Sequence, residues 1–144
     1  QFLQLYPEYK MLFGAVSISN DYRPQSRKMM ISFLENHVYD DDLAKYVKPR
    51  NPERNLFDEQ LAYRLGASCS SIEQVSTLVS ELESDGKGVP TLLKHYLKLG
   101  GKLLGFNKDA VFSNVVDGLI LVDITKTNPL ILKKITGKEE VSAN

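Results

Sequence analysis

The stretch at residues 86–127 constrains the fold of this chain more than any other part of the sequence. It predicts, in order, a turn, a short amphipathic helix ended by Gly-Gly, a strand, a loop and a long apolar strand. That last strand, VVDGLILVDI at 115–124, is apolar on both of its faces. Such a pattern is typical of a central strand covered on both sides. The stretch therefore predicts the closing half of an α+β domain.

Composition narrows the class of protein. The 144 residues predict one domain spanning 1–144, and the apolar content of 42% and charged content of 25% are ordinary for a globular chain. The net charge of zero disfavours a nucleic-acid partner. Cys69 is the single cysteine, so no disulfide forms within the chain, and a cytoplasmic location fits best. No apolar run approaches the roughly 20 residues that span a bilayer.

The first half of the chain predicts a strand, a helix and a loop. KMLFGAVSIS at 10–19 is short, apolar and rich in strand-forming residues. Residues 25–37 carry apolar side chains at helical spacing and predict an amphipathic helix. Three aspartates and the run KPRNPERN predict a surface loop over 39–55. At the other end, we expect the polar tail at 138–144 to fray.

The second half predicts three further helices and a strand before 115–124. A short helix is expected at 58–65. Ser70 or Ser71 can cap the next helix, and Glu73 follows Ser70 at the spacing of a capping box. Further elements are a helix from Pro90 to Leu99, a strand at 102–106 and a last helix at 128–137.

Self-contained catalytic motifs are absent from the sequence. It holds no P-loop, dinucleotide fingerprint, HExxH, CxxC or GxSxG pattern. His37 and His95 lie far apart, with no carboxylate at the spacing of a triad or a metal site. Cys69 lies near a predicted helix start, where it is either a plain structural thiol or a reactive one with a lowered pKa.

Two blocks of the sequence carry a resemblance to a known family. The first is LYPEYKMLFGAVSISNDY at 5–22, followed by the predicted helix and KPRNP at 48–52. The second is DGKGVPTLLKHYLKLGGKLLGFN at 85–107, followed by VVDGLILVDITKT at 115–127. They resemble the bacterial family named hemolysins, GNAT-type N-acyltransferases similar to ornithine-lipid N-acyltransferases and acyl-homoserine-lactone synthases. The resemblance implies a GNAT-like mixed β-sheet flanked by helices, of which this chain is the C-terminal portion.

The resemblance also implies a function. Such an enzyme moves a fatty acyl group from acyl carrier protein or CoA to an amine, on the way to an N-acyl amino acid or aminolipid. The acyl carrier protein thioester or acyl-CoA is the acyl donor, and neither a permanent cofactor nor a metal is implied. Expected partners are acyl carrier protein, an amine or lipid acceptor, a lysophospholipid acyltransferase domain in the same chain or pathway, and the inner face of the membrane.

The family's phosphate-binding turn and the acidic residue of a Glu-Leu-Gly-Arg-like strand do not occur in this sequence. In the family, both precede the region that these blocks resemble. We therefore expect no acyl transfer by the 144 residues alone. The missing strands should also leave one sheet edge unpaired, and unpaired edges recruit partners. A homo-oligomer is the expected consequence.

Site residues follow from the same resemblance. The strand at 10–19 and the helix after it look like the pair beside which a pantetheine thioester lies, because splayed strands leave backbone groups free to bind it. Ser17, Ser19 and Asn20 at the strand's end are the candidate donor-binding residues. The alternative is that the serines only finish the strand and Asn20 forms an Asx turn.

Tyr22 and Tyr96 are the candidate catalytic residues, each as a general acid toward the leaving thiolate. Tyr96 also fits ordinary core packing, because it lies on the apolar stripe of its helix. Asp117 and Asp123 within the apolar strand are either on the active-site side or paired structurally. Two basic clusters could guide an anionic carrier or headgroup, or simply face solvent. They are Lys94, His95, Lys98, Lys102 and Lys108, and Lys48, Arg50 and Arg54.

Two rival functions stay open. One is a binding module for lipids or carrier proteins that has no turnover. The other is a membrane-lysing hemolysin, which needs a cationic amphipathic helix. The predicted helix that begins after Ser71 is acidic on its polar side, and the helix from Pro90 is short, so the sequence disfavours lysis.

Overall fold

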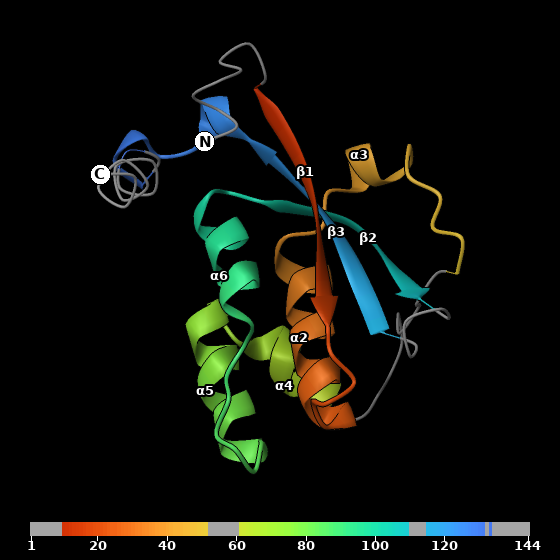
Figure 1. The fold of residues 1–144 in the computed structure, drawn as a ribbon, viewed down its shortest axis with the longest axis vertical. Helices are drawn as coiled ribbons and strands as arrows, with labels where there is room; N and C mark the ends of the chain where they lie inside the picture. Colours follow the sequence, from red (N-terminus) through yellow and green to blue (C-terminus); the bar gives the residue numbers. More distant parts are fainter. Residues whose placement is uncertain (1–9, 52–60, 110–114, 132, 134–144) are drawn as a thin grey trace, which may run out of the picture.

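The computed structural model describes residues 10–51, 61–109, 115–131 and 133. Its elements are drawn in Figure 1 and keep the labels used there. In chain order they are β1 (Met11–Ile18), α2 (Pro24–His37), α3 (Asp41–Ala44), α4 (Leu61–Ser68), α5 (Ile72–Leu82), α6 (Thr91–Lys98), β2 (Lys102–Asp109), β3 (Val115–Asp123) and the 3-10 turn η1 (Ile124–Lys126).

The three described strands form one sheet in the order β1-β3-β2. The predicted central strand is confirmed, because β3 lies between the other two and pairs antiparallel with both. A mixed sheet was expected. Among the described residues, the parallel component is a single isolated bridge between Tyr39 and Leu103. The α+β arrangement is compatible with the GNAT-like fold that the resemblance implies.

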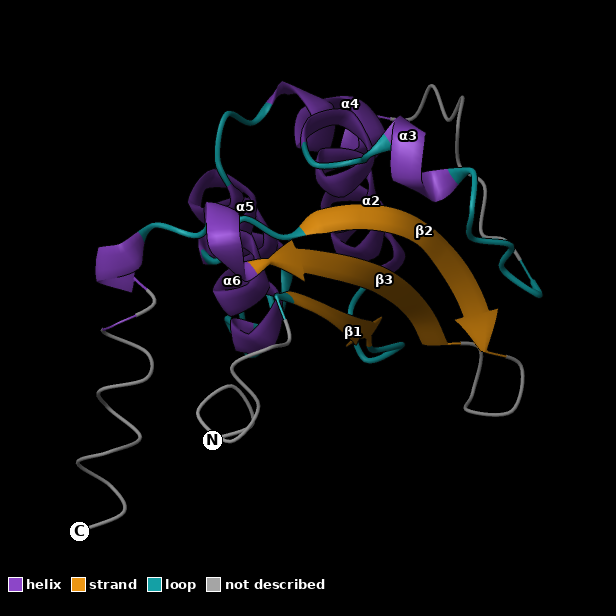
Figure 2. Ribbon diagram, turned by 90° about the horizontal axis from the view of Figure 1, so that it is seen from above, coloured by secondary structure: helices purple, strands orange, loops and turns teal. Residues whose placement is uncertain are grey.

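The helices α2, α4, α5 and α6 lie on one side of the sheet, and Figure 2 shows α2 and α4 together on that side. The short helix α3 lies beside β2. Side-chain burial alternates along β1, because successive residues of a strand point to opposite faces of the sheet. Val16 and Ile18 are buried toward the helices, while Met11 and Phe13 are exposed. The opposite face of β3 is covered only in part within the described residues, by the segment around Val47 and Pro49. On that outer face Leu121 is buried, while Asp117 and Leu119 are half-buried. The prediction of a strand covered on both faces therefore holds fully on the helical side and in part on the outer side.

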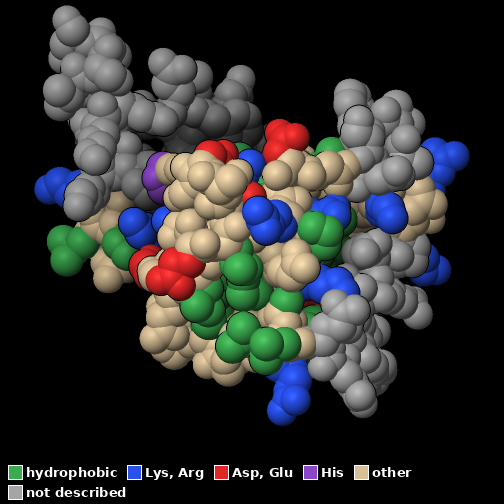
Figure 3. Space-filling view, turned by 90° about the horizontal axis from the view of Figure 1, so that it is seen from below, with side chains coloured by type: hydrophobic (Ala, Val, Ile, Leu, Met, Phe, Trp, Pro, Cys, Tyr) green, Lys and Arg blue, Asp and Glu red, His purple; other side chains and the backbone are tan. Residues whose placement is uncertain are grey.

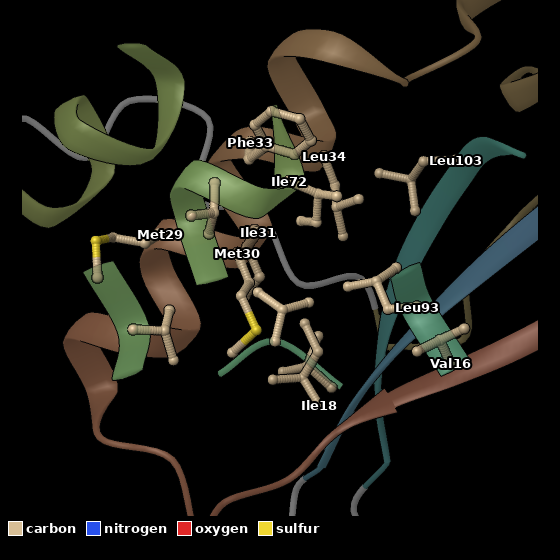
Figure 4. Close-up of a cluster of buried hydrophobic side chains, with 14 of the residues drawn as sticks. Val16, Ile18, Met29, Met30, Ile31, Phe33, Leu34, Ile72, Leu93 and Leu103 are labelled. Atoms are coloured by element: carbon tan, nitrogen blue, oxygen red, sulfur yellow. The ribbon is translucent and has the colours of Figure 1, made fainter. Parts of the chain in front are cut away.

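Side chains from all three described strands and from α2, α4, α5 and α6 meet in one core. Figure 4 shows Ile18 of β1 and Met30 of α2 in the same cluster as Ile72, Leu93 and Leu103, which come from α5, α6 and β2. Met30, Leu93 and Leu103 are fully shielded from solvent. A core that draws on strands and helices far apart in sequence holds the ends of β1 and α2 in place.

The helix predictions hold with one correction. Ser70 does not form a capping box with Glu73. Instead Ser71 is the N-cap of α5 and its Oγ accepts from the Gln74 amide at 3.3 Å. The Gln74 side chain reaches back and accepts from the Ser70 amide at 2.8 Å. The reciprocal capping logic is therefore present, one residue later along the chain.

The predicted surface loop at 39–55 contains a short helix. Asp40 caps α3, because its carboxylate accepts from the Leu43 amide at 3.0 Å. The aspartate run that favoured a loop is therefore a helix start, with Asp41 and Asp42 in the first turn, where acidic side chains complement the helix dipole. Residues 52–55 lie outside the described part of the chain.

Several element ends differ from the predicted ones. The short helix predicted at 58–65 runs as α4 to Ser68, and β2 continues to Asp109 rather than ending at Phe106. Gly100 ends α6 with a φ of 81°, which confirms the predicted glycine stop. Helical residues begin again at Pro129. The remainder of that helix and the tail at 138–144 lie outside the described residues.

Candidate functional site

The outer edge of β1 carries a row of backbone groups that the sheet does not use. The Ile124 amide donates to the Lys10 carbonyl at 2.8 Å, so these two residues form a hydrogen-bonded antiparallel pair. Such pairs alternate along a ladder, and the register has no shift. The even-numbered residues of β1 therefore bond to β3, and the N–H and C=O groups of residues 11, 13, 15 and 17 point away from it. Among the described residues, no strand pairs with that edge.

Ser17 closes this row and is joined to Asp117. The two residues are register partners on β1 and β3, and the Ser17 hydroxyl donates to the Asp117 carboxylate. Sequence reasoning named both residues but did not pair them, because they lie 100 positions apart. The structure therefore brings one predicted donor-binding residue and one predicted carboxylate into a single polar contact on the outer face of the sheet.

Ser19 and Asn20 form the turn that follows β1. The Ser19 hydroxyl accepts from the Asp21 amide at 3.1 Å, and Asn20 Oδ1 accepts from the Arg27 guanidinium at 2.7 Å. The Ser19 contact matches the alternative that this serine finishes the strand. Sequence reasoning missed Arg27. Its spacing to Asn20 is informative only once the turn is known to place the start of α2 beside the end of β1.

Burial and contacts with neighbouring residues fix the position of Tyr22. It is buried, and its hydroxyl donates to the Gly88 carbonyl at 2.7 Å. The Lys87 ammonium lies 4.5 Å from the centre of its ring, a cation–π contact. Burial raises the pKa of the Tyr22 phenol, and the nearby carboxylates of Glu83 and Asp85 raise it further. The phenol is therefore kept protonated and is already engaged with a backbone carbonyl.

Tyr96 lies against the middle of β1 on the helical side. A Cβ placed on Gly14 would lie 2.6 Å from Cζ of Tyr96, so the ring packs where β1 has no side chain. Within the described part of the chain, the Tyr96 hydroxyl makes no hydrogen bond. The structure does not bring the two tyrosines together: Tyr22 contacts Gly88 beyond the end of β1, while Tyr96 contacts Gly14 in its middle.

Glu83 is a buried carboxylate that sequence reasoning missed. It follows α5, and its Oε1 accepts from the Arg23 amide at 2.8 Å, where α2 begins. The Ser26 hydroxyl lies beside the carboxylate, although its geometry falls short of a hydrogen bond. Together with the Arg23 amide and Lys87, this hydroxyl lowers the pKa of Glu83. Glu83 follows one helix and contacts the start of another, and no local sequence pattern predicts such a contact.

A groove lies on the outer face of the sheet, beside the open edge. Its volume is about 310 Å³. Its lining residues come from all three strands and from the segment after α3. They are Ala15, Val47, Pro49, Arg50, Gly105, Phe106, Asn107, Asp117 and Leu119. Six of the nine are apolar or glycine, so the groove favours an apolar ligand.

The remaining candidates, Asp123 and Cys69, make local hydrogen bonds that fit a structural role. Asp123 ends β3 and accepts from the Thr125 amide at 3.0 Å, and its contacts with Thr125 lower its pKa. The Cys69 thiol is buried and donates to the Leu65 carbonyl, and burial raises its pKa. A raised pKa keeps a thiol protonated and argues against a reactive role. Asp123 and Cys69 therefore fit the structural alternatives.

The basic stretch does not form one patch. Lys102 and Lys108 lie at opposite ends of β2, roughly 20 Å apart at the rise of a strand. On the face drawn in Figure 3, basic and acidic side chains are interspersed. Arg54 of the second cluster lies outside the described residues. Within the described residues, no group of three or more His, Cys, Asp or Glu side chains is arranged to hold a metal ion.

Comparison with known proteins finds one informative relative. The chain is 26% identical over 122 residues to a protein named Glycine N(alpha)-acyltransferase from Phocaeicola vulgatus. The match covers 83% of this chain and 37% of the relative, so the chain spans well under half of that protein. No protein-family profile and no solved structure matches the chain. Among the described helices, none combines the length and apolar character needed to cross a membrane.

Proposed function

We propose that this chain is part of an enzyme that moves a fatty acyl group from a thioester to an amine. The observation that carries the proposal is the open edge of β1, which ends at the Ser17–Asp117 contact. A thioester donor with amide groups along its arm needs backbone partners of this kind. The name of the Phocaeicola vulgatus relative, an N-acyltransferase, supports the same reaction class.

The reaction needs a nucleophile and a proton donor. The amine nitrogen attacks the thioester carbonyl carbon, a C–N bond forms, and the C–S bond breaks. Sulfur leaves as a thiolate and takes up a proton, while the amine nitrogen loses one. A phenol near the donor edge can supply the proton to sulfur, which lowers the barrier to C–S cleavage.

Of the two candidate acids, Tyr96 has the hydroxyl that is less engaged by other described residues. Its hydroxyl lies under Gly14 of β1 and has no hydrogen-bond partner in the described part of the chain. The Tyr22 hydroxyl already donates to Gly88, so using it as an acid requires breaking that bond. We therefore assign the proton donor to Tyr96, with Tyr22 as the second candidate. Ser17, Ser19 and Asn20 stay the proposed donor-binding residues.

The finer identity of the reaction follows the sequence resemblance. The donor is acyl carrier protein thioester or acyl-CoA, and the acceptor is an amino acid or a related amine. The product is an N-acyl amino acid on the way to an aminolipid, as in the hemolysin-type family and its ornithine-lipid relatives. Acyl carrier protein and a lysophospholipid acyltransferase are the proposed partners.

Mass spectrometry of lipids tests this proposal. Cells that express the complete gene should accumulate a new N-acyl amino-acid lipid, whose mass identifies both the acyl chain and the acceptor. Tyr96→Phe keeps the ring and removes the hydroxyl, and should lower product formation by about 10²–10⁴-fold. The matched variant Tyr22→Phe should stay close to the parent protein. A larger loss in Tyr22→Phe than in Tyr96→Phe would reverse the assignment.

A non-catalytic binding module is the second candidate, and the apolar groove beside the edge favours it. Such a protein would bind acylated carriers without turning them over. An unchanged lipidome, with the protein well expressed and acyl donors present, would reject the transferase in favour of this module.

A further inference from the structure

Two cross-strand rows form the floor of the groove on the outer face of the sheet. Ala15, Leu119 and Gly105 are register neighbours on β1, β3 and β2. The next row holds Asp117 and Asn107, which are also register partners. The first row has small residues at both ends, and this is why the surface is hollow there. Because neighbouring strands lie about 4.8 Å apart, this row runs roughly 10 Å across the sheet, perpendicular to the strands.

The segment after α3 forms the wall of the groove. Pro49 lies over β2, with its Cγ 3.5 Å from the position that a Cβ on Gly105 would take. Val47 and Arg50 complete this wall. The enclosed volume of about 310 Å³ is at the lower end of the range for small-molecule sites. The hollow therefore has the floor, the wall and the size of a binding groove.

The polar groups of the floor are already engaged. Asp117 accepts from the Ser17 hydroxyl, and Asn107 Oδ1 accepts from the Asn51 amide at 2.8 Å. Leu119 is the middle residue of the apolar row and lines the groove. A ligand that enters the groove therefore meets mainly apolar surface, and a hydrocarbon chain gains more from it than a polar ligand does.

The groove is continuous with the open edge of β1. Ala15 lines the groove, and its backbone N–H and C=O belong to the row that points away from β3. A ligand can therefore bind the edge with its polar arm while its tail crosses the floor. Arg50 is exposed at the rim, and neither row of the floor carries a positive charge.

We propose that this groove binds the hydrocarbon chain of the acyl donor, extended across the three strands from β1 toward β2. The inference rests on the proposed function and names where its donor chain lies. Each methylene group that enters the groove strengthens binding by roughly fourfold, until the floor is filled. The distance from Ala15 to Gly105 thus sets the preferred chain length.

A chain-length series tests this inference. The probes are N-acetylcysteamine thioesters of octanoic, decanoic, dodecanoic and tetradecanoic acid, whose neutral heads exclude attraction to Arg50. Binding is measured by displacement of cis-parinaric acid, a fluorescent fatty acid. We expect affinity to rise with chain length and then to level off. Equal affinity across the series would contradict the proposal, and so would no binding at all.

Gly105→Leu should shorten the groove. Among the described residues other than its chain neighbours, only Pro49 lies within 4 Å of the added Cβ. Because 3.5 Å is an ordinary contact, the backbone tolerates the change. We expect the affinity to level off at a shorter chain, with a loss of at least about tenfold for the longest probe and little change for the shortest. Ala15→Leu narrows the groove from the β1 side and should act in the same direction, which keeps the test decisive if one variant folds poorly.

Ser84→Leu is the matched control, because it adds the same group at an exposed site outside the groove. Thermal unfolding of all three variants confirms that each is folded. If Ser84→Leu changes the profile as much as Gly105→Leu, the groove is not the site. The readout is binding rather than turnover. An intact chain-length profile in a protein that makes no new lipid would therefore reject the proposed reaction and leave the groove assignment standing.

Discussion

The two edge strands of the sheet, β1 and β2, differ in how the rest of the described chain hydrogen-bonds to their outer backbone groups. On the β2 side, the Leu103 amide donates to Val38 at 2.8 Å and the Leu103 carbonyl accepts from Asp40 at 3.0 Å. Farther along, the Lys108 amide donates to Asn51 at 2.8 Å. On the β1 side, no described segment pairs with the strand. Within the described residues, one edge is therefore covered by the protein's own chain, and the other is unpaired.

The burial of the side chains also differs between these two edge strands. Leu103 on β2 is fully buried in the core, whereas Phe13 on β1 is 65% exposed. The open edge lacks the usual protections of an exposed strand, because β1 itself contains no proline, no charged residue and no bulge. An edge left both apolar and unprotected in this way is typical of a surface that binds a partner or a ligand.

The largest effect is expected at the covered edge. Leu103→Ala removes a fully buried side chain and should lower the free energy of unfolding by about 2–5 kcal/mol. Urea denaturation followed by circular dichroism measures this. A loss as small as that of a surface substitution would mean that the Leu103 side chain is not packed in the core.

A smaller effect is expected in the middle of the open strand. Gly14→Ala forces a Cβ against the Tyr96 ring and should cost about 1–3 kcal/mol of unfolding free energy. The cost should fall in a Tyr96→Leu background, because the ring that it meets is gone. A double-mutant cycle with no coupling between the two positions would show that Tyr96 does not pack against β1.

The pH dependence tests how the end of β1 is held. The folded-state pKa of Glu83 lies below its ordinary value of 4.5, so its contribution to stability is present above that pH. It is lost as the pH falls through the lowered folded-state pKa. Glu83→Gln should therefore be less stable than the parent protein at neutral pH, and the difference should shrink in acid. Urea midpoints measured from neutral pH downward check this, and a constant difference would contradict it.

The smallest effect on stability is expected at the open edge itself. Phe13→Lys changes an exposed side chain and should alter the free energy of unfolding by no more than about 0.5 kcal/mol. The substitution should instead change the association of one copy of the chain with another. If copies of the chain pair through β1, light scattering should show an oligomer for the parent protein and a smaller species for the variant, since an edge lysine opposes strand pairing. A monomeric parent protein would count against the expected homo-oligomer.

Local patterns in the sequence predict most of the described elements. The apolar, strand-forming run in 10–19, the helical spacing in 25–37 and the apolar run of β3 each depend on neighbours a few residues apart. The structure confirms all three. The same kind of reasoning failed at Asp40, where an aspartate run was interpreted as loop although aspartate also favours a helix start. Propensity alone cannot separate the two, because aspartate is favoured in turns as well as at helix starts.

The candidate site depends on contacts that no local pattern contains. The sequence named Ser17, Asp117, Tyr22 and Tyr96 as separate candidates, but it could not show that the first two touch or that the two tyrosines are apart. Glu83 and Arg27 gave no signal, because each acts on a residue of another element. Spacing along the chain specifies which elements form. Strand register and packing decide which edge stays open and which side chains meet, because those contacts join residues tens of positions apart.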